Sequence, residues 1–281
     1  MEPRPLWEAV ERYHQSCYWA PEVREAGSSA GLKGFWMNYF ATRAAPMGPV
    51  RPEVVESLFF YFAPARVRRA LPDAWTFSTP EAILQARFAG VGAALERQLG
   101  ATHDAETDAA LAVVRSAVEA TDTTGRPLAA AWKALPEPAD ARVALWLGCT
   151  VLRELRSGSH LTALVAAGLD GCESIVSHVA VDEAPIDWIE HEAGWTAAEA
   201  AAATDRLRAR GWVDDVGMAT ELGRARRADI EAMTDDLDRR HWEQVGESAC
   251  RSLLEALRAL DAHLPRDDQL DWREIYGPNE R

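Results

Sequence analysis

The sequence has few cysteines and no long apolar run. Its four cysteines are scattered and form no CxxC pair, so reduced thiols inside helices are the simplest interpretation. No uninterrupted apolar stretch approaches the roughly 20 residues needed to cross a bilayer. The first residues lead into a helical pattern without an apolar signal core. These absences predict a cytoplasmic protein that does not enter the membrane.

The common enzyme signatures are also absent. The chain contains no P-loop, no GxGxxG, no nucleophile elbow and no HExxH. No catalytic residue or cofactor can therefore be named from a motif, and an enzyme is the less favoured interpretation.

Basic charge is in short supply. The chain has 30 Lys and Arg against 44 Asp and Glu, a formal net charge of −14. Most of the affinity of a DNA-binding protein comes from neutralising phosphates. DNA is therefore a possible partner only if the basic residues gather on one local face, and the overall charge disfavours it.

The residues that are abundant favour helices. Hydrophobic residues make up 48% of the 281 positions, and alanine, leucine, arginine and glutamate are frequent. The length suits one large or two medium domains. We predict an all-α fold with a small β element.

Two stretches of the chain resemble each other. AGLKG at residues 30–34 and AGLDG at residues 167–171 are separated by 167 − 30 = 137 positions. Trp75 and Trp212 have the same separation, 212 − 75 = 137. Two landmarks at one spacing suggest an internal duplication.

The duplication suggests a division into domains. Glycine and proline concentrate in residues 122–140, the best candidate for a linker. We predict one repeat over residues 1–121, a second over residues 141–264 and a charged tail over residues 265–281. Gly158 is expected to interrupt the first helix of the second repeat.

The second half carries a familiar order of elements. A short helix, a turn, a second helix, Arg-Gly-Trp, a ribbon over residues 213–219 and Thr-Glu-x-Gly-Arg opening a long helix follow one another. Residues 186–240 resemble the DNA-binding lobe of the MarR regulators, with residues 213–219 as the wing. The phrases GLKGFWMNYFATRAAPMGPV, FAPARVRRALPDAW and HLTALVAAGLDG resemble an actinobacterial helix-turn-helix family without an established activity.

The MarR resemblance implies a tandem duplicated winged helix-turn-helix. Trp212 to Thr220 spans eight positions, but Trp75 to Thr79 spans four, so the first repeat lacks its wing. Because MarR proteins act as dimers, the chain is expected to be a monomer that forms an intrachain pseudo-dimer, or a homodimer. The terminal helices of the two halves, 80–120 and 221–263, should then pack together.

The same resemblance implies a ligand site among aromatic and polar residues. The wall of this site is predicted to comprise Tyr13, His14, Tyr18, Trp36, Tyr39 and Arg43. Arg66 and Arg69 could add a fork for a carboxylate or phosphate. The alternative is that the aromatic residues belong to the core and the arginines are solvated.

A second candidate cluster lies in the second half. His160, Glu173 and His178 could bind a ligand or support acid–base chemistry, but their spacings match no metal-binding helix pattern, and no metal site is predicted. The acidic residues Asp187, Glu190, Glu192 and Glu199 occupy positions that would meet phosphates, which disfavours DNA.

Two functions follow from these patterns. The first is a small-molecule-binding MarR-like protein that acts as a ligand-responsive transcriptional regulator. The alternative is an enzyme or cofactor-binding protein of specialised metabolism, built on a winged-helix scaffold that no longer binds DNA.

Overall fold

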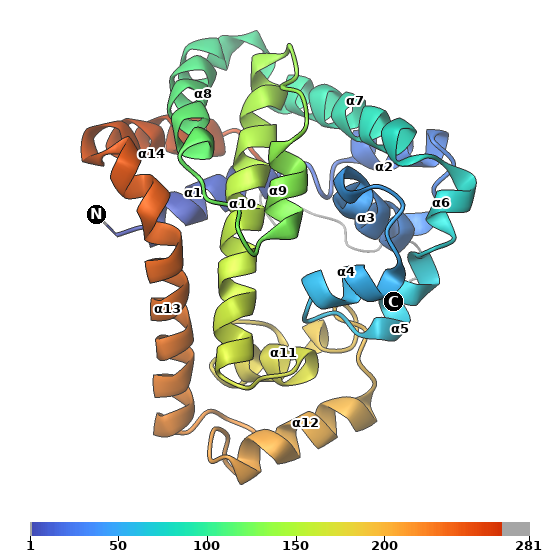
Figure 1. Ribbon diagram of the computed structural model, residues 1–281, viewed down its shortest axis with the longest axis vertical. Coiled ribbons are helices and arrows are strands. Elements are labelled where there is room, and N and C mark those ends of the chain that lie inside the picture. Colours follow the sequence, from blue (N-terminus) through green and yellow to red (C-terminus); the bar gives the residue numbers. More distant parts are fainter. Residues whose placement is uncertain (1, 266–281) are drawn as a thin grey trace. The chain divides into compact units, whose positions relative to one another are not determined.

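The computed structural model describes residues 2–265, and its elements are helices (Figure 1). In the described residues there is no strand. The tail predicted over residues 265–281 lies outside this range beyond Pro265. The elements are α1 (Arg4–Gln15), α2 (Pro21–Ser29), α3 (Gly34–Ala44), η1 (Ala45–Met47), α4 (Pro52–Leu58), α5 (Pro64–Ala70), α6 (Ala74–Phe77), α7 (Pro80–Leu99), η2 (Gly100–His103), α8 (Asp104–Glu119), α9 (Pro127–Lys133), α10 (Ala141–Ala166), α11 (Gly171–Ala180), η3 (Ile186–Trp188), α12 (Ala197–Ala209), α13 (Glu221–Val245) and α14 (Glu247–Asp261).

Local capping explains where several helices begin. The Thr79 side chain accepts a hydrogen bond from the backbone N–H of Ala82, and Pro80 occupies the first turn of α7. Asp170 with Glu173 closes a capping box on α11, and Thr196 with Glu199 closes one on α12.

The two AGLxG stretches adopt the same turn. In each, the first glycine has a positive φ, +97° at Gly31 and +68° at Gly168, and ends a helix. The glycine N–H donates to the carbonyl three residues earlier, and the leucine N–H donates to the carbonyl five residues earlier. This pair of hydrogen bonds is the Schellman pattern. These bonds run from Gly31 to Ser28 (2.9 Å), Leu32 to Gly27 (3.0 Å), Gly168 to Val165 (3.0 Å) and Leu169 to Leu164 (3.1 Å). The shared letters therefore specify a helix stop and a new start, and the duplication stays a prediction.

The expected break at Gly158 is wrong, because α10 runs through it without interruption. A Cβ at this position would lie 2.9 Å from Cγ of Arg126, so the glycine leaves room for that side chain. Within the predicted linker, residues 127–133 form α9, whose Leu128 and Trp132 are buried.

The chain divides into two compact units. Unit 1 comprises residues 2–50 and 70–158 and, within the described range, 237–265. Unit 2 comprises residues 51–69 and 159–236. Each unit is therefore assembled from both halves of the sequence, a division different from the tandem one.

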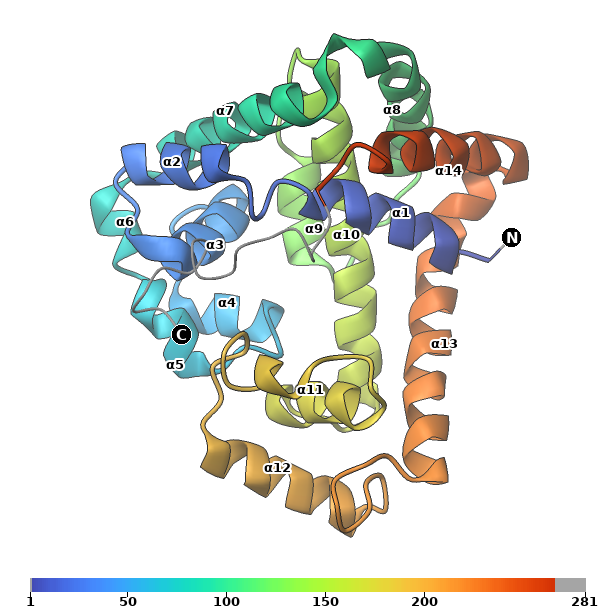
Figure 2. The same cartoon turned by 180° about the vertical axis from the view of Figure 1, so that it is seen from behind.

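Unit 1 is a bundle of helices. In both views α2 lies along α7, and α1 and α8 pack against α14 (Figures 1 and 2). The contact of α8 with α14 is the packing expected between the terminal helices of the two halves. The largest fully buried side chains of unit 1 include Trp132, Trp146 and Phe40.

Unit 2 contains the lobe for which a helix-turn-helix was predicted. Helix α11 packs on α12. The hydrophobic core of this unit includes Leu164, Leu169, Val176, Leu207, Trp212 and Ile230. The short helix expected at the start of the lobe predicted over 186–240 is reduced to the 3-10 turn η3.

The predicted wing is reduced to a tight hairpin. Val213 and Ala219 form one isolated antiparallel bridge, and the Asp214 N–H bonds to the Met218 carbonyl at 2.8 Å. Asp214 also accepts the N–H groups of Val216 and Met218, which curls the intervening residues into a turn. Too few residues remain on either side for a two-stranded ribbon.

Among residues 2–265, no single helix is long and apolar enough to cross a membrane. The bent pair formed by α10 and α11, at 95°, meets the length and composition test only when the two are taken together.

Candidate functional site

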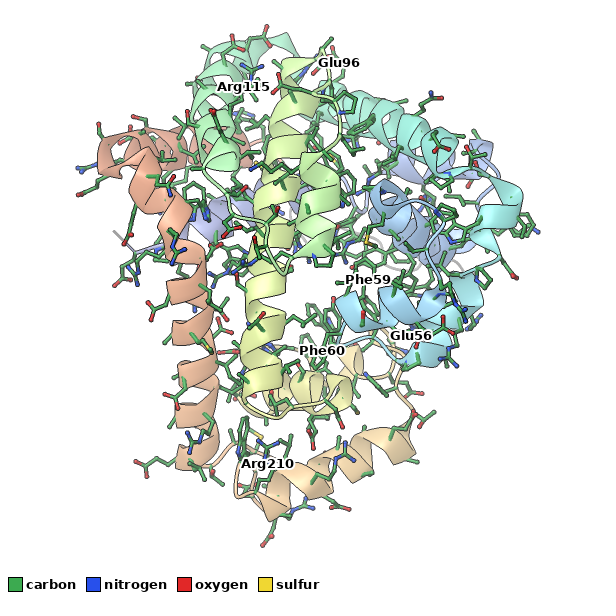
Figure 3. All side chains as sticks on the ribbon, viewed as in Figure 1. Glu56, Phe59, Phe60, Glu96, Arg115 and Arg210 are labelled. Atoms are coloured by element: carbon green, nitrogen blue, oxygen red, sulfur yellow. The ribbon has the colours of Figure 1, made fainter. Side chains whose placement is uncertain are left out.

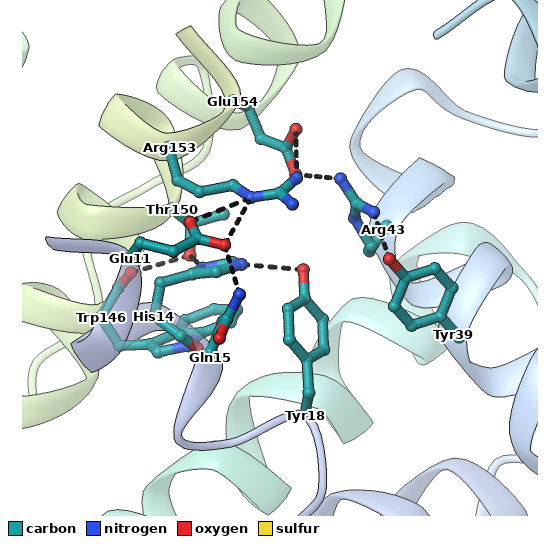
Figure 4. Close-up of polar contacts among 10 residues, drawn as sticks. All are labelled: Glu11, His14, Gln15, Tyr18, Tyr39, Arg43, Trp146, Thr150, Arg153 and Glu154. Carbon is teal, nitrogen blue, oxygen red and sulfur yellow. Dashed lines mark hydrogen bonds and ion pairs between the residues drawn. The ribbon is translucent and has the colours of Figure 1, made fainter. Parts of the chain in front are cut away.

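A buried polar cluster surrounds His14 in unit 1 (Figure 4). Four helices and the turn after α1 contribute to it, so residues more than 100 positions apart meet. We call this group the His14 cluster; its members are Glu11, His14, Tyr18, Tyr39, Arg43, Arg87, Trp146, Thr150, Arg153 and Glu154.

The hydrogen bonds of His14 determine its tautomer. Thr150 gives its only hydroxyl proton to the Trp146 carbonyl at 2.8 Å, so it accepts from His14 Nδ1 at 2.9 Å. His14 Nε2 then accepts from the Tyr18 hydroxyl at 2.8 Å. Burial, followed by the charges of Arg153, Arg43 and Arg87, holds the His14 pKa well below its usual value. His14 is therefore a neutral base that receives the Tyr18 proton in a hydrogen bond.

A chain of ion pairs crosses the cluster. The Arg43 guanidinium meets Glu154 at 2.8 Å, and Arg153 bridges Glu154 at 3.1 Å and Glu11 at 3.2 Å. The Glu154 side chain is only 1% exposed. Burial alone would raise its pKa, but the two guanidinium groups keep that pKa below the usual range. The carboxylate is thus charged, and Arg43 also donates to the Tyr39 hydroxyl at 2.6 Å.

Arg87 differs from the other two arginines. It is 4% exposed and lies over the rings of Tyr18 and Trp146, with centroid distances of 5.0 and 5.2 Å. None of the residues between 2 and 265 gives it a hydrogen bond or a carboxylate partner. Burial lowers its pKa. Three arginines against Glu11 and Glu154 leave the cluster with one excess positive charge, 3 − 2 = 1.

Four of the six predicted wall residues belong to this cluster. His14, Tyr18, Tyr39 and Arg43 contact one another directly or through Glu154 and Arg153, and the Trp36 ring packs edge-on against Tyr39 at 5.8 Å. Tyr13 does not join them: its hydroxyl donates to the carbonyl of Arg142 at 3.3 Å.

The predicted arginine fork lies elsewhere. Arg66 and Arg69 belong to unit 2. Arg66 donates to the Glu190 carbonyl at 3.1 Å, and Arg69 is exposed. Neither is part of the His14 cluster.

The second predicted cluster is partly assembled. The rings of His160 and His178 lie 5.9 Å apart, but Glu173 closes the α11 capping box and pairs with Arg206 at 2.8 Å. Arg227 donates to the His178 ring instead, at 3.0 Å from Nε2. Throughout residues 2–265, no three His, Cys, Asp or Glu side chains converge in a way that could hold a metal ion.

Several cluster residues were missed from the sequence. Arg153 and Glu154 stand in the middle of an otherwise apolar part of α10, and Arg87 stands beside the apolar stripe of α7. Charged residues inside a buried face are rare unless paired, which is the signal that could have identified them.

A profile of a helix-turn-helix family matches residues 3–270, nearly the whole chain. This chain belongs to that helix-turn-helix family. No curated protein and no solved structure matches it. Family membership indicates a DNA-binding regulator at a coarse level.

Helix α12, the second helix of the predicted helix-turn-helix lobe, offers little to a base edge. Its exposed residues include Ala197, Ala198, Glu199, Ala201, Ala202 and Asp205. Its arginines are engaged inside the lobe: Arg206 with Glu173, Arg208 with the Asp214 carbonyl and Arg210 with the carbonyls of Ala167 and Gly168. Direct readout normally relies on free arginine, lysine, asparagine or glutamine side chains.

Proposed function

We propose that this protein is a small-molecule-binding, MarR-like helix-turn-helix protein, a ligand-responsive transcriptional regulator whose effector is an anion. The effector binds in the His14 cluster. The observation that carries the proposal is the burial of Arg87 without a carboxylate partner among the described residues. A buried guanidinium without a carboxylate is costly, and an anion would offset that cost.

The surroundings of Arg87 suit such a ligand. Tyr18 and Trp146 provide aromatic walls beside the charge, and the neutral His14 adds no repulsion or attraction of its own. Arg43 and Arg153 are already occupied by Glu154, so the excess positive charge resides on Arg87. A guanidinium presents five donors, enough to hold a carboxylate or phosphate in a defined orientation.

Two features support the regulatory part. The order α11, α12, hairpin and α13 follows the winged helix-turn-helix arrangement, and α8 packs on α14 as MarR dimerisation helices would. One chain with two repeats would then act as a pseudo-dimer, or two chains as a homodimer.

Thermal denaturation with a panel of formate, acetate, benzoate and phosphate tests the anion site. At a hundredfold excess over Kd, a stabilising anion should raise the Tm by about 5 °C. Arg87→Met should melt higher than the wild-type protein without anion, since an unpaired buried charge is removed, and should lose the response.

Arg97→Met is the matched control, because Arg97 lies on the same helix but is half exposed and paired with Glu22. It should respond like the wild-type protein. If Arg87→Met keeps the full response, or if no anion of the panel stabilises the wild-type protein more than this variant, the Arg87 site is refuted.

The alternative is an enzyme or cofactor-binding protein that has abandoned DNA. The engaged arginines and alanine-rich surface of α12 favour it. Absorption spectra and metal analysis of the purified protein test this alternative. A visible chromophore or a stoichiometric metal, together with no retardation of DNA at low salt, would support it over the regulator.

A further inference from the structure

A groove of about 580 Å³ lies on unit 2, between the end of α10 and the first half of α13. We call it the α10–α13 groove. It is lined by Ala163, Ala166, Ala167, Arg210, Trp212, Leu222, Arg226, Asp229, Ile230 and Met233. Its volume lies within the range of small-molecule pockets, roughly 300 to 1,000 Å³.

The walls of the groove are apolar, and part of them faces solvent. Trp212 and Ile230 are buried beneath it, whereas Leu222 is 45% and Met233 42% exposed. The three alanines of α10 are short, which leaves the space between the two helices open. An apolar ligand body would cover side chains that otherwise contact water.

The charges lie among these apolar residues. Arg210, labelled in Figure 3 at the end of α12, donates to the carbonyls of Ala167 and Gly168 and lies 4.6 Å from the centroid of the Trp212 ring. These contacts fix the direction of its guanidinium. Arg226 is exposed, and Asp229 contacts it at 3.4 Å. A Glu173 oxygen outside the groove lining also lies 3.8 Å from Arg210, whose side chain is 34% exposed. Arg226, with a side chain that is 55% exposed, is therefore the guanidinium more open to a ligand.

We propose that the α10–α13 groove binds an amphipathic monocarboxylate. The apolar body lies against Met233 and the alanines of α10, and the carboxylate meets Arg226 with Arg210 beside it. The exposed guanidinium of Arg226 beside the apolar walls matches one anionic head and one apolar tail. This site is separate from the Arg87 site and does not depend on it.

A ligand in the groove would contact the segment that connects α12 to α13. Trp212 follows Gly211, which ends α12, and the Thr220 hydroxyl donates to the Gly211 carbonyl at 2.6 Å just before α13 begins. A ligand bound in the groove would therefore stabilise the connection between α12 and α13.

Calorimetric titration with octanoate and with octan-1-ol tests the proposal, because the two probes share the tail and differ in the head. The wild-type protein should bind octanoate more tightly than octanol. Arg226→Gln should weaken octanoate about tenfold and leave octanol within about twofold. Arg224→Gln, an exposed arginine of the same helix that does not line the groove, should leave both within about twofold.

Ala166→Phe provides an independent test, since this exposed alanine lines the groove and a larger side chain fills it. Both probes should lose binding, with the helical circular dichroism unchanged. The proposal is overturned if octanoate does not bind, if Arg224→Gln weakens it as much as Arg226→Gln, or if a folded Ala166→Phe binds normally. A wild-type dimer in sedimentation that Ala166→Phe converts to a monomer would also overturn it, by assigning the groove to a second copy.

Discussion

Buried histidines link the protonation of single residues to the stability of the whole protein. His241 is 4% exposed, and burial, with a smaller effect of Arg126, lowers its pKa to about 3. Its Nε2 has no hydrogen-bond partner within residues 2–265. The burial of His14 acts in the same direction. Both side chains are therefore neutral in the folded protein at neutral pH.

The difference between the pKa of His241 in the folded protein and in the unfolded chain predicts a pH dependence of unfolding. The unfolded chain takes up a proton near pH 6.5, whereas folded His241 does not until about pH 3. The contribution of neutral His241 to the unfolding free energy is therefore fully present above pH 6.5 and is lost progressively as the pH is lowered. Between pH 7 and pH 5 this residue should cost about 2 kcal/mol of unfolding free energy, measurable by urea denaturation.

His241→Leu should remove this share and leave the part of the slope that is due to His14. His191→Leu, at an exposed histidine, is the control and should leave the slope as it is. A His241→Leu variant with the slope of the wild-type protein would contradict the assignment.

At the scale of elements, helix termini followed from the sequence, but helix continuity did not. Thr79-Pro80 and Thr196 are recognisable helix starts in the sequence because capping depends on three or four neighbouring residues. Gly158 carries a propensity cost of about 1 kcal/mol within a helix, yet α10 continues through it. The packed side chain of Arg126 explains the glycine, and that contact spans 158 − 126 = 32 residues.

Two glycines distinguish packing from propensity. Gly171 begins α11, and a Cβ there would overlap the carbonyl oxygen of Phe60, which is backbone and cannot move away cheaply. Gly171→Ala should lower the unfolding free energy by about 2 kcal/mol. Gly92, in the middle of α7, meets only a Val143 methyl at 3.4 Å, and Gly92→Ala should raise it by about 0.5 to 1 kcal/mol. Denaturant titration of both variants measures the contrast; equal effects would refute it.

For the whole molecule, the open question is how an acidic chain of net charge −14 would contact DNA. The regulator hypothesis predicts retardation of DNA from upstream of its own gene at about 50 mM salt, weakening steeply toward about 200 mM. Ala198→Glu, on the exposed surface of α12, should weaken that binding by about tenfold or more. Ala112→Glu, an identical change on the exposed surface of α8, should have little effect.

Equal losses from both substitutions would show that charge alone matters and that α12 does not face DNA. No retardation at low salt would refute the regulatory function while leaving the Arg87 and α10–α13 proposals to their own tests.

The sequence by itself determined the helical class and several helix caps, because each depends on residues within one or two helical turns. It also indicated His14, Tyr18, Tyr39 and Arg43 together, since they form two pairs that are each four residues apart, His14 with Tyr18 and Tyr39 with Arg43. Only the tertiary structure decided what surrounds them. Arg43 meets Glu154 across 111 positions and Glu11 meets Arg153 across 142, and no local pattern encodes such a contact. The isolation of Arg87 is likewise a property of the folded core, where burial and the absence of a carboxylate become visible at once.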